Sequence, residues 1–120
     1  MTLFDSPAFE GHEAVHAFTD EASGLKCVIA VHSTARGPAA GGCRMWAYPT
    51  AAAALEDALK LSRAMSYKNA MADLELGGGK AVIIGDSRTM KTPALLSAVS
   101  ANETDSGFQL AEGFGLIAVT

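Results

Sequence analysis

Apolar and polar positions along the chain predict strands that alternate with helices. Residues 25–32 (LKCVIAVH) are apolar on both sets of alternating positions, which is typical of a strand that is covered on both faces. Residues 14–20 precede a turn at 21–24 and are predicted to form the first arm of a hairpin with that strand. A glycine-rich loop is expected at 37–42 (GPAAGG), followed by a further short strand at 43–48.

The clearest helix is predicted over residues 51–67. Thr50 is a good N-cap, because its side-chain oxygen can accept a hydrogen bond from a backbone N–H of the first turn. Glu56 and Lys60 stand four residues apart, in the favourable order for an ion pair on the exposed face. The stripe expected to face the core consists of Ala51, Leu55, Ala58, Leu59, Ser62 and Met65.

The second half of the chain continues the same alternation. Three glycines at 77–79 are expected to break the chain before a short apolar strand at 80–84. A second helix is predicted at 92–101, which begins with Thr-Pro, because proline is well tolerated in the first turn. A strand-like segment follows at 107–110. Alternating strands and helices make this an α/β fold, and the length allows a single domain over 1–120.

Composition narrows the function and the compartment. A formal charge of −4 argues against a nucleic-acid surface, and no apolar run reaches the roughly 18–20 residues that cross a bilayer. The N-terminus shows no secretory signal, and Cys27 and Cys43 are not spaced as C-x-x-C, so reduced thiols in the cytoplasm are expected. Alanine accounts for 23 residues and buries little surface, so another chain or domain is expected to complete the apolar packing.

One motif resembles a zinc site. Residues 12–16 match H-E-x-x-H, which requires a helix to bring both histidines onto one metal ion. In an extended segment His12 and His16 would stand about 13 Å apart. We therefore expect two partly exposed strand histidines and no metal.

Two glycine motifs resemble nucleotide-binding loops. Residues 113–118 match G-x-G-x-x-A, which needs a helix and a later acidic residue that the remaining sequence does not supply. Residues 77–80 (GGGK) resemble a P-loop, but Leu74 replaces its first glycine and Ala81 its Ser or Thr. Neither motif predicts a cofactor site in this chain.

Two lysines stand close to apolar residues or glycines in the sequence. Lys68 follows the end of the predicted helix, and Lys80 follows the glycine triplet. A lysine in an apolar setting near a second lysine should have a lowered pKa, so that it can act as a general base while its neighbour holds a carboxylate. The alternative is that both ammonium groups simply reach into water.

Four segments together resemble a known family. Residues 24–32, 37–46, 55–72 and 76–86 are similar to the N-terminal domain of the amino-acid dehydrogenases (Glu/Leu/Phe/Val dehydrogenases), and most of all to its leucine dehydrogenase branch. The resemblance covers about residues 10–98. It implies a mixed sheet with flanking helices and a homo-oligomer built through this domain.

The resemblance also implies roles for individual residues. Lys68 matches the lysine that binds the substrate α-carboxylate, and Lys80 matches the catalytic base. Gly41 and Gly42 match the loop whose backbone lies against the substrate. Ala40 matches a position that lines the side-chain pocket, and Met65 matches a residue beside the substrate. Such enzymes convert an L-amino acid to a 2-oxo acid and ammonia, and they pass hydride to NAD on a separate Rossmann domain that we do not find in this chain.

One departure leaves two functions open. The family has an aspartate that handles a proton where this chain has Gly113. The chain is therefore either the substrate-binding half of such a dehydrogenase, inactive alone, or a non-catalytic oligomerisation domain derived from it. Under the first reading, aliphatic or aromatic amino acids are the expected substrates.

Overall fold

The computed structural model describes residues 3–86, 108–111 and 116–119, and for the last two segments the backbone only. The predicted helix at 92–101 and Gly113 lie outside these residues. No helix in the described part is long and apolar enough to cross a membrane. The elements are η1 (Leu3–Asp5), β1 (Ala14–Asp20), β2 (Leu25–Ser33), β3 (Ala39–Trp46), α1 (Ala51–Met71), β4 (Gly77–Ile84), β5 (Phe108–Ala111) and β6 (Leu116–Val119).

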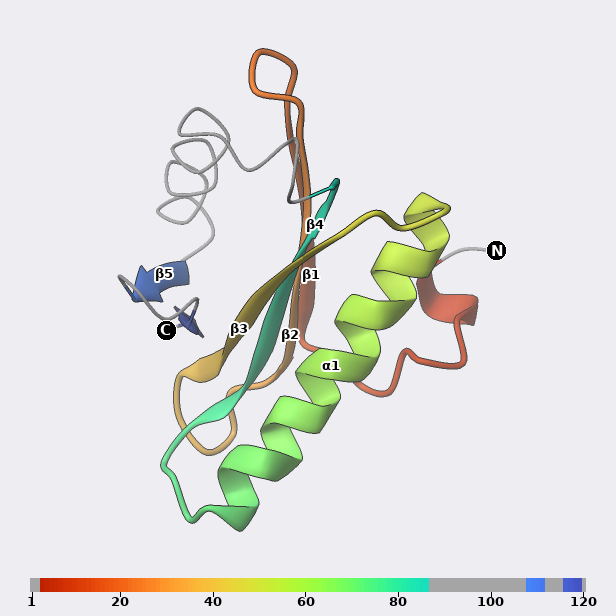
Figure 1. The fold of residues 1–120 in the computed structure, drawn as a ribbon. Coiled ribbons are helices and arrows are strands. Elements are labelled where there is room, and N and C mark those ends of the chain that lie inside the picture. Colours follow the sequence, from red (N-terminus) through yellow and green to blue (C-terminus); the bar gives the residue numbers. More distant parts are fainter. Residues whose placement is uncertain (1–2, 87–107, 112–115, 120) are drawn as a thin grey trace.

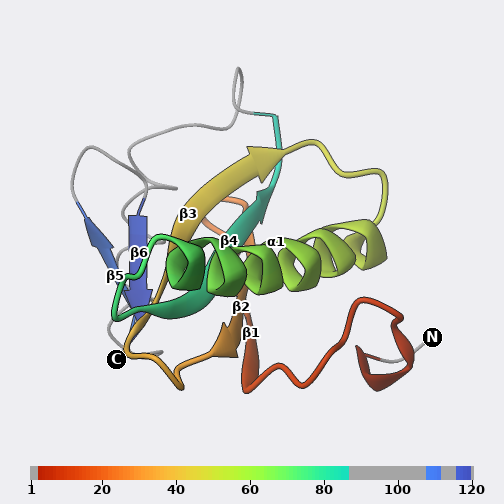
Figure 2. The same cartoon turned by 90° about the horizontal axis from the view of Figure 1, so that it is seen from below.

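Six strands form one mixed sheet in the order β1-β2-β4-β3-β6-β5 (Figure 1). Only β3 and β4 are parallel, and every other neighbouring pair is antiparallel. Parallel strands need a long connection, and here α1 makes it by running back from the end of β3 to the start of β4. The helix therefore lies across one face of the sheet (Figure 2). The predicted α/β class, the hairpin of β1 with β2 and the strand β5 are confirmed.

The helix α1 begins where the sequence predicts it and ends later. The Thr50 side chain accepts a hydrogen bond from the backbone N–H of Ala53 at 3.1 Å, as expected for an N-cap. The predicted end at residue 67 is wrong, because the helix continues to Met71. The extra turn carries the buried Asn69, which hydrogen-bonds the carbonyls of Ala40 and Gly77 in the sheet.

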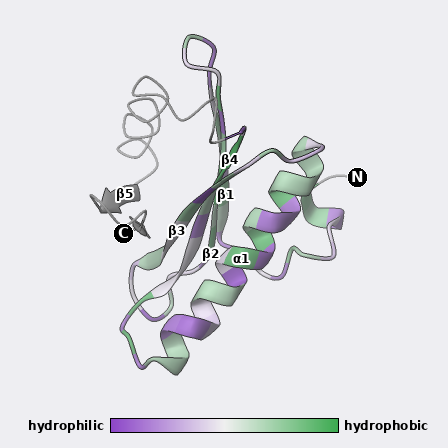
Figure 3. Ribbon diagram, in the orientation of Figure 1, coloured by the Kyte–Doolittle hydropathy of each residue, from purple (hydrophilic) through white to green (hydrophobic). Residues whose placement is uncertain are grey.

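Two apolar clusters pack on opposite faces of the sheet. The cluster beneath α1 contains Ala8, Ala30, Ala54, Ala58, Leu59 and Val82. The cluster on the opposite face contains Leu25, Cys27, Ile29, Val31, Ala39, Ala81 and Ile83. Figure 3 shows polar and apolar residues interspersed along α1, as expected for a helix with one face on a core.

The glycine-rich segments are strands, which corrects two predictions. The expected loop at 37–42 is strand from Ala39 onward, and the triplet at 77–79 opens β4 instead of breaking the chain. The reason is helix packing: a Cβ on Gly78 would lie 2.3 Å from the backbone nitrogen of Ser66 in α1. Glycine at this position lets the helix approach the strand closely.

Candidate functional site

Lys80 lies in the middle of the sheet and faces α1. It stands directly opposite Ala30 of β2, and opposite residues in a ladder point to the same face of the sheet. Ala30 is buried in the cluster beneath α1 together with Ala54 and Ala58 of the helix. Lys80 is thus a half-buried residue on the face of the sheet that α1 covers.

Burial lowers the pKa of Lys80. Desolvation is the largest cause, because it disfavours the charged form of the amine. Among the nearby charges, Cys43 and Asp57 raise this pKa, whereas Lys68 and Arg44 lower it. The sequence prediction of a lysine with a lowered pKa near a second lysine is confirmed, and such an amine can accept a proton closer to neutral pH.

The C-terminal half of α1 brings further predicted residues to the same place. Lys68 is exposed on the helix, one turn after Met65. A Cβ on Gly41 would lie 3.2 Å from Cγ of Met65, so the backbone of β3 passes beside this side chain. Asn69 also donates a hydrogen bond to the carbonyl of Ala40. The chemical roles given to these residues by resemblance stay predictions, while the fold places them around one stretch of α1, β3 and β4.

The sequence analysis missed two features of the candidate site, a buried amide and a charge pair. Asn69 is buried and bridges β3 and β4, and Asp57 with Arg44 forms a charge pair that acts on Lys80. Asn69 follows Ser62 and Ser66 at helical spacing, and a polar stripe of that kind on a core-facing side could have drawn attention to it.

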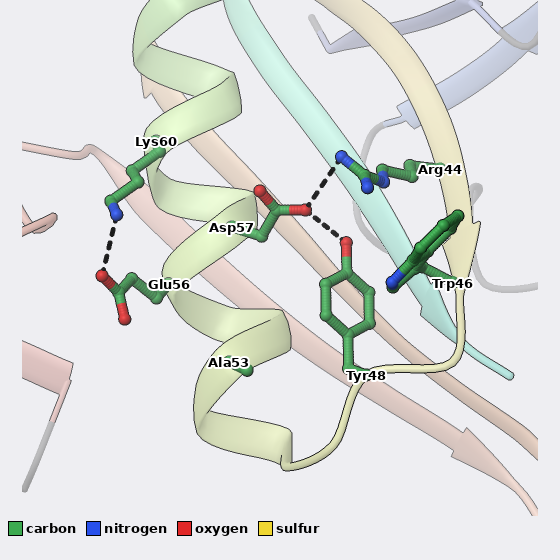
Figure 4. Close-up of a pocket in the computed structure, with 7 residues that line it drawn as sticks. All are labelled: Arg44, Trp46, Tyr48, Ala53, Glu56, Asp57 and Lys60. Atoms are coloured by element: carbon green, nitrogen blue, oxygen red, sulfur yellow. Dashed lines mark hydrogen bonds and ion pairs between the residues drawn. The ribbon is translucent and has the colours of Figure 1, made fainter.

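A cavity in the described part lies toward the start of α1 and is lined by neither Lys68 nor Lys80. Its volume is about 310 Å³, and its lining residues are Arg44, Trp46, Tyr48, Ala53, Glu56, Asp57 and Lys60. Figure 4 shows that the carboxylate of Asp57 forms an ion pair with Arg44, at 3.5 Å, and accepts a hydrogen bond from the hydroxyl of Tyr48. Desolvation and this hydrogen bond raise the pKa of Tyr48. Because Asp57 already pairs with Arg44 and Tyr48, we place the candidate site at Lys68 and Lys80 and not in this cavity.

The fold does not bring the two histidines of the H-E-x-x-H motif onto one helix. The prediction of two partly exposed strand histidines is wrong for His12, which precedes β1 and is only 7% exposed. Its Nδ1 accepts from the backbone N–H of Glu10 at 3.1 Å, and its Nε2 lies 2.8 Å from the carbonyl of Leu59 in α1. His16 lies in β1, as predicted. Among the described residues no group of three His, Cys, Asp or Glu side chains could hold a metal ion.

His12 predicts an acid-sensitive contact. Desolvation lowers its pKa below the usual 6.5, so the unfolded chain binds a proton more readily than the folded one. The stability that neutral His12 contributes should be present above pH 6.5 and lost as the pH falls toward the lowered pKa. We expect His12→Gln to destabilise the protein at pH 7.5 and to flatten the fall in stability between pH 7 and pH 5. Urea unfolding at each pH measures this, and an equally steep fall in the variant would contradict it.

The described residues of the two nucleotide-loop motifs also lie in strands. Gly77–Ile84 forms β4, so the GGGK segment does not open a helix, and Leu116–Val119 forms β6, where the dinucleotide fingerprint would need one. The described residues therefore do not form a phosphate-binding turn of either kind.

Comparison with known proteins identifies the family. A family model described as "Glu/Leu/Phe/Val dehydrogenase, dimerisation domain" matches residues 10–105. This chain belongs to the Glu/Leu/Phe/Val dehydrogenase family. The resemblance seen in the sequence motifs is confirmed, and the match corresponds to the N-terminal domain of these amino-acid dehydrogenases.

Individual relatives of this dehydrogenase domain agree with the family assignment. Valine dehydrogenase of Streptomyces albus is 61% identical over 97 residues, which are 81% of this chain and 26% of that enzyme. Leucine dehydrogenase of Geobacillus stearothermophilus is 53% identical over 98 residues, which are 82% of this chain and 27% of that enzyme. The chain thus spans about a quarter of the length of these relatives.

Solved structures show the same fold as this dehydrogenase domain. L-tryptophan dehydrogenase from Nostoc punctiforme superposes with a TM-score of 0.75 at 44% identity, covering 81% of this chain and 29% of that one. A hetero-hexameric glutamate dehydrogenase from Thermus thermophilus gives a TM-score of 0.64 at 25% identity, covering 79% and 24%. The mixed α/β architecture is therefore that of amino-acid dehydrogenases.

Proposed function

We propose that this domain is the substrate-binding half of a dehydrogenase that converts aliphatic or aromatic L-amino acids to 2-oxo acids and ammonia. The observation that carries the proposal is Lys80, a half-buried amine of lowered pKa that faces α1 and feels the charge of Lys68. A buried amine beside an exposed one separates two tasks. Lys68, exposed on α1, is placed to bind a carboxylate, and Lys80 is available to take a proton.

The side chains around the lysines favour an apolar substrate. Ala40 and Met65, the two predicted lining residues that carry side chains, are both apolar. A dicarboxylic substrate would call for a further cation here to bind its second carboxylate. The relatives named above include valine and leucine dehydrogenases, which agrees with this class.

The remaining parts of the proposal concern partners. NAD is the expected hydride acceptor, but the described residues do not fit a dinucleotide, because the described parts of both glycine motifs are strands. We assign its binding to a part of the enzyme outside the described residues. We further propose a homo-oligomer built through this domain, which the description of the matched family supports. The cytoplasm remains the expected compartment, since Cys27 and Cys43 form no disulfide in the described part of the chain.

A non-catalytic domain that retains only oligomer contacts is the second candidate. Gly113 favours it, because glycine cannot transfer the proton that the family's aspartate handles. The two candidates differ in what the lysines do. A catalytic half must bind the substrate carboxylate, whereas a relic has no need to.

A chimeric enzyme tests the proposal directly. Residues 10–105 of this chain replace the corresponding segment of the Streptomyces albus valine dehydrogenase, so that the host supplies everything beyond the match. We expect NADH production with L-valine or L-leucine and much less with L-glutamate. A folded chimera with no activity on any apolar amino acid would overturn the proposal in favour of the relic. Extending the replacement through residue 120 introduces Gly113, and restoring aspartate there (Gly113→Asp) should then raise the activity.

Ligand binding by the chain itself gives a second test. We expect L-leucine or its 2-oxo acid to raise the melting temperature, because ligands that bind only the folded state stabilise it. Lys68→Ala should abolish this shift, since the carboxylate loses its cation, while Lys26→Ala, an exposed lysine of β2, should keep it. A shift that survives in Lys68→Ala would show that the ligand binds elsewhere.

A further inference from the structure

Asn69 is a buried polar residue at the centre of the candidate site. It follows Lys68 directly in the last turn of α1 and is 7% exposed. Its Nδ2 lies 2.6 Å from the carbonyl oxygen of Gly77 and 3.3 Å from that of Ala40. One amide group thus connects the helix to the first residues of both parallel strands.

The chemistry of these partners fixes how the amide points. Carbonyl oxygens only accept hydrogen bonds, so the nitrogen of Asn69, and not its oxygen, must face them. The NH₂ group carries two hydrogens, and each can serve one carbonyl, one from β3 and one from β4. A buried amide with both hydrogens placed is a rigid bridge, because breaking it leaves carbonyls without a donor.

The bridge sits where the ladder between the two strands is interrupted. Paired residues run from Ala39 opposite Gly77 to Ala40 opposite Gly78, and pairing resumes with Cys43 opposite Ala81. Gly41 and Lys80 both fall inside that interrupted stretch. Each of them is paired with its other neighbouring strand, Gly41 with Ile117 and Lys80 with Ala30. Between β3 and β4 themselves, the amide supplies a connection at the near end of the gap.

We propose that Asn69 is a positioning residue, which fixes the Gly41 backbone, Lys68 and Lys80 relative to one another. The inference rests on the proposed function, since it names what holds that site in shape. Lys68 is carried on the helix turn that the amide anchors. Gly41 follows the Ala40 carbonyl directly, and Lys80 stands three residues after the Gly77 carbonyl.

Removal of the amide tests the proposal on the chain itself. Asn69→Ala should bind L-leucine and its 2-oxo acid about tenfold more weakly, measured by calorimetry, because two buried carbonyls lose their donor. Ser62→Ala is the matched control. Ser62 is fully buried on the same helix, but its hydroxyl donates within the helix, to the Leu59 carbonyl at 3.0 Å. Its loss should weaken the helix without changing ligand affinity.

A pH series with Asn69→Asp separates positioning from simple stability. At pH 8 the carboxylate has no hydrogen to donate and is repelled by the two carbonyl oxygens, so affinity should fall as in Asn69→Ala. Burial beside two carbonyl oxygens should raise the pKa of the introduced carboxyl, so that at lower pH its protonated form can donate one hydrogen bond in nearly the same shape. The affinity ratio of variant to wild type should therefore recover as the pH falls, whereas that of Asn69→Ala should stay constant.

The outcomes distinguish this inference from the proposed function. If the wild-type chain binds neither ligand at any pH, the proposed function fails and this inference fails with it. If the wild type binds and Asn69→Ala binds as tightly, only the inference is wrong. Equal losses in Asn69→Ala and Ser62→Ala, or no recovery of Asn69→Asp at low pH, would assign Asn69 to general stability. Should Asn69→Ala not fold, the nearly isosteric aspartate variant decides.

Discussion

Replacement of Gly78 by alanine is expected to destabilise the fold by about 3 kcal/mol or more, a large share of the stability of a domain this size. A Cβ at this position would lie 2.2 Å from the Ser66 hydroxyl, 2.3 Å from the Ser66 nitrogen and 2.4 Å from the Ser62 carbonyl. Two of these atoms belong to the helix backbone, so no side-chain rotation relieves the overlap. The helix must move away from β4, and buried contacts along both elements are lost.

The neighbouring glycine is the matched control. A Cβ on Gly79 would meet the Ala39 Cβ at 3.4 Å, which is ordinary contact, and its backbone needs no left-handed conformation. Gly79→Ala should therefore change the free energy of unfolding by less than about 1 kcal/mol. Urea denaturation followed by circular dichroism measures both variants. Equal effects at the two positions would show that the close approach of α1 to Gly78 is not what selects glycine.

Lys80→Met in the chimeric dehydrogenase is expected to lower kcat/KM by about a thousandfold, because general-base catalysis contributes that order of rate enhancement. Methionine keeps much of the length of the side chain and removes the proton acceptor. Lys26→Met, on the exposed part of β2, serves as control and should leave turnover unchanged. Activity within a few fold of the parent in Lys80→Met would remove Lys80 from the mechanism.

The same substitution should raise stability, which separates a catalytic lysine from a structural one. Because desolvation lowers the pKa of Lys80, the unfolded chain binds its proton more tightly, and folding carries a penalty below the lowered pKa. That penalty disappears as the pH rises past the usual lysine value of 10.5. Lys80→Met should thus unfold at higher urea than the wild type at pH 7, with the difference shrinking toward pH 10.5. A destabilised variant at pH 7 would mean that the ammonium group holds the fold together.

Much of this architecture could be predicted from local patterns. Apolar residues on both alternating faces predicted β2, and Thr50 marked the start of α1, since both signals act within a few residues. The predicted neighbour Lys68 is among the groups that lower the pKa of Lys80, although desolvation is the larger cause. The errors fell where distant segments meet, at the glycine-rich starts of β3 and β4 and at the last turn of α1.

The sequence by itself determined the α/β class and the family, and it singled out Lys68 and Lys80 as candidates, because short-range periodicity and long motifs carry that information. Only the tertiary structure decided why the glycines are there, where α1 ends and which groups surround Lys80. Gly78 is a contact surface for α1, Asn69 joins the helix to two strands, and His12 fastens the N-terminal segment to the Leu59 carbonyl. Each depends on atoms from segments far apart along the chain. The local sequence around a glycine, an amide or an imidazole does not show whether that group faces water or a buried backbone. Its role is therefore decided only when the helix packs on the sheet.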